Sequence, residues 1–243
     1  MRSTPDPTAP IGLQAPLLAG SPPDRRSFAF SVLAAALVAW LPVAALGAGG
    51  GVRVEIKDPK GAPVANAVAS LVPLDATPQL TPPAEPAVVL QADEEFSPYV
   101  TAIVVGTRVS FPNRDKVQHH VYSLSKPKRF ELPLYRGESK EPVLFDQPGV
   151  VTLGCNIHDW MSAHIVVLAT PYFARSGADG LVPLQNLPPG RYRLDVWHPR
   201  MAAPVMRDVV ITATDAATQV ISVTLRPDRR IRRAPEGSDG GYK

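Results

Sequence analysis

From residue 52 onward, hydrophobic and polar residues alternate over short stretches, as in half-buried β-strands. Val52, Val54 and Ile56 are apolar with charged residues between them, and a second apolar stretch ends at Leu71 after an Asp-Pro-Lys-Gly turn. The next segment predicts the strands Val88–Gln91, Thr101–Val105, Arg108–Phe111, His120–Ser123, Phe130–Leu134, Val143–Phe145, Val150–Leu153 and Ala163–Leu168. Strands this short, separated by turn residues, indicate antiparallel β-sandwiches.

After Pro171 the pattern of strands and turns continues, with stretches at Leu181–Leu184, Tyr192–Val196, Val209–Thr212 and Val220–Leu225. No helical periodicity of useful length is present, so the predicted fold class is all-β: a Greek-key sandwich plus a second small β-sandwich. The proline-rich stretch 73–87 is typical of a stiff connector between modules.

The segment 52–85 has too few strands to be stable alone, yet together with 170–226 it has the length of one seven-stranded sandwich. We therefore expect the central module, 86–169, to be inserted into a sandwich built from these two parts. Val52–Ile56 should then pair with Tyr192–Val196 or Val220–Leu225. The alternative is that Val52–Leu71 adds strands to the central module itself.

Composition narrows the class of protein. Hydrophobic residues make up 45% of the chain and charged residues 19%, which is typical of a folded globular protein. The net charge is only +3, and the basic excess lies in a glycine- and arginine-rich tail, 227–243, that we expect to be disordered. A nucleic-acid-binding function would need a basic stripe on the folded part, so we expect no nucleic-acid partner.

The N-terminal segment 1–47 is typical of an export signal. The apolar run Phe28–Leu46 follows Arg25-Arg26 and precedes small residues, so we expect cleavage after Gly47 and a periplasmic protein. The paired arginines partly resemble a twin-arginine signal. The alternative is an uncleaved membrane anchor, since the run is just long enough to cross a bilayer.

An exported chain with one cysteine is unusual, because oxidising compartments favour disulfide pairs. Cys155, His158 and Met161 lie within seven residues, and His119-His120 lies upstream at the start of a predicted strand. Two imidazoles, one thiolate and a weak axial methionine are the ligands of blue copper sites, and this set serves both Cu(I) and Cu(II). The residues therefore predict one copper ion per chain.

The same region resembles the cupredoxin family over about Val88–Leu168. Three segments carry the resemblance: Phe111–His119, with its Asn113 turn; Gly149–Cys155; and Met161–Val167, which follows a Cys-x-x-His-x-x-Met loop. The resemblance implies that His119, Cys155 and His158 bind copper, with Met161 axial. His120 is the alternative to His119, and it stands where cupredoxins commonly have an asparagine.

The resemblance implies a one-electron carrier whose partners are redox proteins such as a cytochrome or a dehydrogenase. Its electron port would be the outer edge of His158, with Trp160 nearby. Four protein ligands leave no open position for a substrate, and no competing catalytic motif is present, so we expect no enzyme. The alternative is a module for copper binding or delivery, or for binding within the cell envelope, without electron shuttling.

The flanking segments resemble a carboxypeptidase-regulatory-like (transthyretin-like) sandwich, through Val52–Leu71 and Leu184–Val196. Chains of this layout are often labelled methylamine-utilisation proteins. Of the remaining candidates, we expect His164 to be a solvated strand residue, His198 to be structural and Asp93-Glu94-Glu95 to be a solvated turn.

Overall fold

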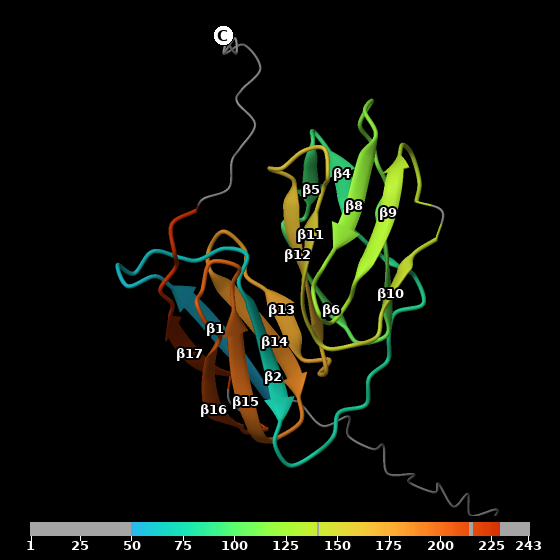
Figure 1. Cartoon of the computed structure of the whole chain (residues 1–243). Helices are drawn as coiled ribbons and strands as arrows, with labels where there is room; N and C mark the ends of the chain where they lie inside the picture. The colour runs from blue at the N-terminus through green and yellow to red at the C-terminus, as the bar shows by residue number, and fades with distance from the viewer. Residues whose placement is uncertain (1–49, 140, 214–215, 229–243) are drawn as a thin grey trace, which may run out of the picture. The chain divides into compact units, whose positions relative to one another are not determined.

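The computed structural model describes residues 50–139, 141–213 and 216–228 (Figure 1). These residues form β-strands and turns and no helix, so the chain is all-β as predicted. None of them forms a helix that is long and apolar enough to cross a membrane. The predicted export signal 1–47 and nearly all of the tail 227–243 lie outside the described residues.

The first and last strands of the described chain form one sandwich, here called the flanking sandwich. In its first sheet, β1 (Gly50–Lys57) lies between antiparallel β14 (Leu181–Leu187) and parallel β17 (Ala216–Ser222). The second sheet has the order β13-β2-β15-β16. Its strands are β13 (Phe173–Arg175), β2 (Val68–Pro73), β15 (Gly190–Trp197) and β16 (Val205–Ile211).

Alternation in β1 explains why one face of this strand packs into the core of the flanking sandwich. Val52, Val54 and Ile56 are buried, while the residues between them are exposed or half-buried. They join Leu71, Leu194 and other apolar residues of both sheets in one hydrophobic core. Burial of an aliphatic side chain contributes about 1.5–3 kcal/mol, so this core stabilises strands that are distant in sequence.

The pairing of β1 bears on the predicted insertion. Glu55 lies opposite Val220 in the β1–β17 ladder, which is the pairing that the insertion hypothesis requires. Within the described residues, β1 and β2 form no ladder with strands of the central module. The domain boundaries themselves remain a prediction.

The strands between residues 87 and 168 form the central sandwich. One sheet has the order β6-β12-β11-β8-β9, a second has the order β10-β7-β3, and β4 and β5 form a hairpin. The strands are β3 (Ala87–Val88), β4 (Leu90–Ala92), β5 (Glu95–Ser97), β6 (Val100–Val104), β7 (Thr107–Ser110), β8 (His119–Ser123), β9 (Phe130–Tyr135), β10 (Val143–Phe145), β11 (Gly149–Gly154) and β12 (Ser162–Leu168).

The core of the central sandwich continues into the candidate metal centre. Phe111, Phe145 and Ile165 are fully buried within it, and Cys155 and Met161 belong to the same hydrophobic cluster. A side chain that is packed on all sides loses its rotamer freedom, so this end of the core holds its residues in fixed positions.

The predicted strand Val88–Gln91 was wrong as a single element. The chain changes partners at the fully buried Val89, so that β3 pairs with β7 while β4 pairs with β5. The short strands β5 and β13 were not predicted. Three-residue strands carry too little alternation to be distinguished from turns.

Candidate metal centre

Two adjacent strands bring the predicted ligands to one edge of the central sandwich. Cys155 directly follows β11, and His119 is the first residue of β8. The two strands are antiparallel, with Gly154 opposite Tyr122, so the chain that continues from β11 into Cys155 runs toward His119 at the start of β8. His158 lies on the loop that connects β11 to β12, and Met161 is the last residue before β12.

Three ligand atoms point toward one another at this edge. His119 Nδ1 lies 3.1 Å from His158 Nδ1, and Cys155 Sγ lies 4.0 Å from the first nitrogen and 3.8 Å from the second. Of the described residues, these three are the group of His, Cys, Asp or Glu side chains close enough to share an ion. His119 and Cys155 are buried, whereas His158 is half-buried.

The spacing and the donor chemistry both fit a bound metal ion. Metal bonds to imidazole and thiolate are about 2.0–2.3 Å long, so one ion reaches atoms that are separated by less than twice that length. A thiolate is a poor ligand for Mg²⁺ or Ca²⁺, and a set of two imidazoles with one thiolate suits copper. Met161 is buried in the same cluster as Cys155, and its backbone N–H donates to the His158 carbonyl at 2.9 Å.

His120 lies outside the three-residue cluster. Neighbouring residues of a strand point to opposite faces, and His120 Nε2 pairs with Glu131 Oε1 at 2.8 Å. His120 is nonetheless buried, with 8% of its surface exposed, and its Nδ1 has no hydrogen-bond partner. The structure therefore groups His119, not His120, with Cys155 and His158; that this group binds copper remains a prediction.

Asn113 fixes the loop that leads to His119. Its Nδ2 donates to the carbonyls of Val117 and Tyr135 at 3.0 and 2.9 Å, and its Oδ1 accepts the Asp115 N–H at 2.9 Å. The side chain is buried, so each of these hydrogen bonds would be costly to lose. The Asn113 turn therefore sets where β8 begins.

Asp115 contacts His119 on the side away from Cys155. The Asp115 Oδ2 lies 2.7 Å from His119 Nε2. Burial alone raises the pKa of the Asp115 carboxyl, but hydrogen bonds from His119 and from the Glu94 and Asp93 N–H groups outweigh it and lower the pKa. Asp115 is therefore an anionic acceptor at neutral pH. Sequence reasoning did not assign it a role.

Next to this loop, the half-buried Tyr135 and the fully buried Gln91 form a polar pair. The Tyr135 hydroxyl donates to the Phe111 carbonyl, and Gln91 Nε2 donates to the Tyr135 hydroxyl at 2.6 Å. Burial, the largest cause, raises the pKa of Tyr135 to about 12. The phenol therefore stays neutral and keeps its donor at physiological pH, which supports the backbone beneath Asn113.

The prediction for His164 was only partly right. His164 points away from the core, as expected, but it is half-buried and therefore only partly exposed to solvent. Its Nδ1 lies 3.1 Å from Thr152 Oγ1, and its ring packs edge-on against Tyr99 with 5.4 Å between centroids. The neighbouring aromatic ring, which sequence alternation could not place, covers part of the expected solvent-exposed surface.

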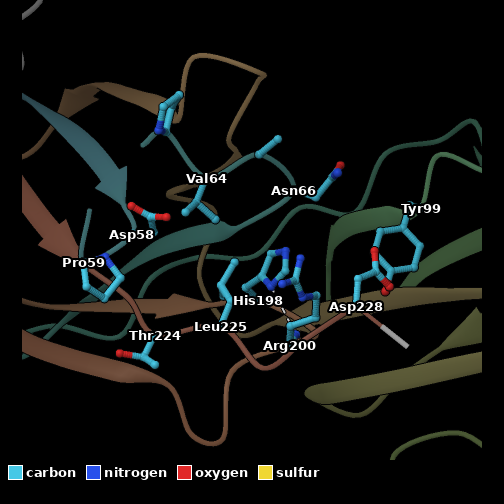
Figure 2. A pocket seen from close by; sticks show the side chains of 12 residues that line it. Asp58, Pro59, Val64, Asn66, Tyr99, His198, Arg200, Thr224, Leu225 and Asp228 are labelled. Carbon is cyan, nitrogen blue, oxygen red and sulfur yellow. Dashed lines mark hydrogen bonds between the residues drawn. The ribbon is translucent and has the colours of Figure 1, made fainter. Parts of the chain in front are cut away.

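Figure 2 shows a polar pocket that contains no residue of the candidate metal centre. His198 lines it and is buried, and its Nδ1 accepts the Arg200 backbone N–H at 3.1 Å. This hydrogen bond closes a turn, which agrees with the structural role expected for His198. The lining mixes acidic and basic side chains, with Asp58 and Asp228 besides Arg200.

No protein-family model matches this sequence. No curated protein matches it in a sequence search either.

Solved structures similar to this chain include three copper-associated proteins. A Cu-containing nitrite reductase from Thermus scotoductus SA-01 is 26% identical over 40% of this chain, with a TM-score of 0.33. A purple cupredoxin from Nitrosopumilus maritimus is 24% identical over 34% of this chain and 99% of its own, with a TM-score of 0.30. A Cu(I) form of an amicyanin mutant is 20% identical over 41% of this chain and 98% of its own, with a TM-score of 0.32.

These matches are partial and their TM-scores are low. The alignment spans about a quarter (25%) of the nitrite reductase. The activity named for that enzyme is therefore a property of that enzyme alone.

Proposed function

We propose that this chain is an exported type 1 copper protein that carries single electrons between redox partners. The observation that carries the proposal is the cluster of His119 Nδ1, His158 Nδ1 and Cys155 Sγ, all within 4.8 Å of one another. With Met161 as a weak fourth ligand, this is the donor set of blue copper sites. When bound, copper supplies a one-electron Cu(II)/Cu(I) couple.

The side chains around the cluster suit electron transfer better than substrate turnover. His119, Cys155 and Met161 are at most 4% exposed, so water has little access to three of the four proposed ligands. A set of four protein ligands leaves no open position for a substrate, in contrast to catalytic metal sites. We therefore infer a carrier and not an enzyme.

The exposed edge of the centre is the proposed entry point for electrons. His158 is half-buried and its ring lies 5.2 Å from that of Trp160, while Ile157 is 49% exposed. Asp159 is also exposed and places an acid among these apolar groups. We infer a redox partner, such as a cytochrome or a dehydrogenase, with a basic or polar docking face.

The visible spectrum of the purified protein with Cu(II) tests the proposal. A short thiolate–copper bond gives an intense blue colour and a narrow copper hyperfine splitting in EPR, so we expect both for the wild type. Cys155→Ser should abolish the colour, and His158→Ala should abolish or strongly alter it. His164→Ala is the matched control, because His164 lies outside the cluster, and it should stay blue.

A colourless wild-type protein that binds only Zn²⁺ would refute the electron-carrier proposal. That result would favour the alternative of a metal-binding or delivery module. A blue protein whose colour survives Cys155→Ser would show that another group binds the metal, and the proposed ligand set would then be wrong.

The partner surface is tested by electron exchange with a panel of cytochromes. Charge attraction across a docking face is screened by salt, so the exchange rate should fall as ionic strength rises. Asp159→Asn should weaken this dependence. Rates that ignore both ionic strength and this substitution would refute the inferred docking surface.

We further infer export to the periplasm from residues 1–47. Mass spectrometry of protein recovered from the periplasm should show a chain that begins at Ala48. Recovery of the full-length chain in the membrane fraction would instead favour the uncleaved anchor.

A further inference from the structure

Asp115 is held by a set of hydrogen bonds that the proposed metal ligands alone do not explain. Asp115 Oδ2 accepts from His119 Nε2 at 2.7 Å, Oδ1 accepts the Asp93 N–H at 2.7 Å, and Oδ2 also accepts the Glu94 N–H at 3.0 Å. The Asp115 side chain is 14% exposed and that of His119 is fully buried. Both carboxylate oxygens are thus engaged, and the carboxylate has one orientation.

The two backbone donors come from a turn that is itself unusual. Asp93 and Glu94 connect β4 to β5 with φ angles of 56° and 57°, which non-glycine residues seldom adopt. Such residues cost of order 1–3 kcal/mol each and persist where the surroundings hold them. Here both N–H groups of the turn donate to Asp115. The turn and the carboxylate therefore hold each other in place.

This arrangement has a chemical consequence for His119. A histidine that binds a metal through Nδ1 carries its proton on Nε2, and an acceptor at Nε2 fixes that tautomer and the ring orientation. A carboxylate also makes the imidazole a stronger electron donor. A stronger donor stabilises Cu(II) more than Cu(I), and this difference lowers the reduction potential.

We propose that Asp115 is a positioning residue that lowers the reduction potential of the centre by orienting His119 and strengthening it as a ligand, with the β4–β5 turn holding Asp115. The inference rests on the proposed function, because it assumes that His119 binds copper. It goes beyond that function by assigning the potential to a residue that does not touch the metal.

The test compares Asp115→Asn with the wild type in copper affinity, reduction potential and EPR spectrum. An amide accepts a weaker hydrogen bond than a carboxylate, and its NH₂ group cannot accept from the turn. Loss of such an outer partner typically lowers metal affinity by about 10- to 100-fold. We expect that loss mainly for Cu(II). Each tenfold decrease in the ratio of Cu(II) affinity to Cu(I) affinity raises the reduction potential by about 59 mV.

Three further variants separate the positioning role from charge and from folding. Glu138→Gln removes an exposed carboxylate that pairs with Arg114 on the same loop and does not touch His119, so the potential should change little. Asp115→Glu keeps a carboxylate and should recover most of the lost Cu(II) affinity. Asp93→Asn with Glu94→Gly keeps both turn N–H groups, so it should leave the potential unchanged.

The same variants are titrated with Co²⁺, which needs no redox activity. A 10- to 100-fold weaker Co²⁺ affinity for Asp115→Asn than for Glu138→Gln supports the inference even if the wild type is not blue. Equal affinities for these two variants, or equal potentials, would overturn it. If Asp115→Asn does not fold, Asp115→Ser, which also removes the carboxylate that accepts from His119, takes its place: a Co²⁺ affinity equal to that of Glu138→Gln would overturn the inference.

A colourless wild type would reject the proposed function, because that function requires blue copper. A blue wild type whose potential ignores Asp115→Asn would reject the role of Asp115 alone. The two failures are therefore distinguishable.

Discussion

The flanking and central sandwiches bury their polar side chains for different purposes. In the flanking sandwich, Ser176 and Thr170 are buried and bond to backbone groups of distant segments. In the central sandwich, His119 is buried and bonds to the carboxylate of Asp115, and Asn113 holds the loop between them. The first arrangement joins strands, whereas the second orients a candidate ligand.

This difference suggests how the chain divides stability from chemistry. A buried hydroxyl that bonds to backbone satisfies groups that folding removes from water, so its contribution is to stability. A buried imidazole supported by a carboxylate fixes a tautomer and a donor direction, so its contribution is to the metal site. Substitutions in the two sandwiches should therefore affect different measurements.

The largest expected effect on stability comes from the flanking core. Leu194 is 1% exposed, and Leu194→Ala should lower the free energy of unfolding by about 2–5 kcal/mol, because it leaves a cavity. Urea denaturation of the metal-free protein measures this loss. While the variant is folded, its Cu(II) spectrum should match that of the wild type.

Leu153→Ala is the matched substitution in the central core. Leu153 is equally buried and lies two residues before Cys155, so this variant should lose stability and also alter the spectrum. If Leu194→Ala changes the spectrum as much as Leu153→Ala does, the division between the two sandwiches is wrong.

A smaller loss is expected at Ser176. Its hydroxyl donates to the Val64 carbonyl at 2.8 Å and accepts the Ala67 N–H at 2.9 Å, which joins segments on either side of the central sandwich in sequence. Ser176→Ala leaves both backbone groups without this partner, at a cost of about 1–3 kcal/mol.

Hydrogen exchange provides the specific measurement for Ser176→Ala. The Ala67 amide should exchange faster in this variant, with no change at Cys155. Ser222→Ala is the control, because Ser222 is exposed and its removal should change little. Unchanged exchange at Ala67 would show that Ser176 does not hold the two segments together.

Local patterns predicted much of the fold. The alternation of Val52, Val54 and Ile56 predicted β1, and its buried face is the one observed. The spacing of Cys155 and His158 in one loop predicted two residues of the cluster. Both features depend on residues that are close in sequence, where side-chain direction follows from backbone geometry.

Features that depend on distant residues were beyond the reach of the sequence. Asp115 receives the two backbone hydrogen bonds that hold its carboxylate from a turn more than twenty residues upstream, and nothing near Asp115 in the sequence marks that contact. The change of partners at Val89 depends on two sheets that flank it. Likewise, alternation along the strand placed His164 in solvent, because its contact with Tyr99 depends on the fold and leaves no local sequence signal.

Met161 sharpens the comparison, because it is both a core residue and a proposed ligand. Met161→Leu conserves volume, so it should cost less than about 1.5 kcal/mol of stability. It should nevertheless raise the potential, because a weak donor to copper is lost, whereas Met161→Gln should lower the potential through a harder oxygen donor. Voltammetry measures both changes.

Leu194→Met is the reciprocal exchange in the flanking core. It should have a similarly small effect on stability and none on the potential. If Met161→Leu and Met161→Gln both leave the potential unchanged, Met161 is not an axial ligand, and its role is limited to packing in the core.

The smallest expected effect is at the start of the proline-rich connector, where Asp75 pairs with Arg191 of β15. The hydrogen bond from Arg191 lowers the pKa of the Asp75 carboxyl below its ordinary value of 3.8. Because the folded-state pKa is the lower one, the stability from this pair is present above about pH 3.8 and is lost as pH falls through the folded-state pKa.

Asp75→Asn should therefore destabilise the protein slightly at pH 7. The difference should disappear in acid, and it should shrink in high salt because the pair is exposed. Thermal unfolding of the metal-free protein at pH 7 and pH 3 measures this, and an equal difference at both pH values would show that the carboxylate charge of Asp75 is not what anchors the connector.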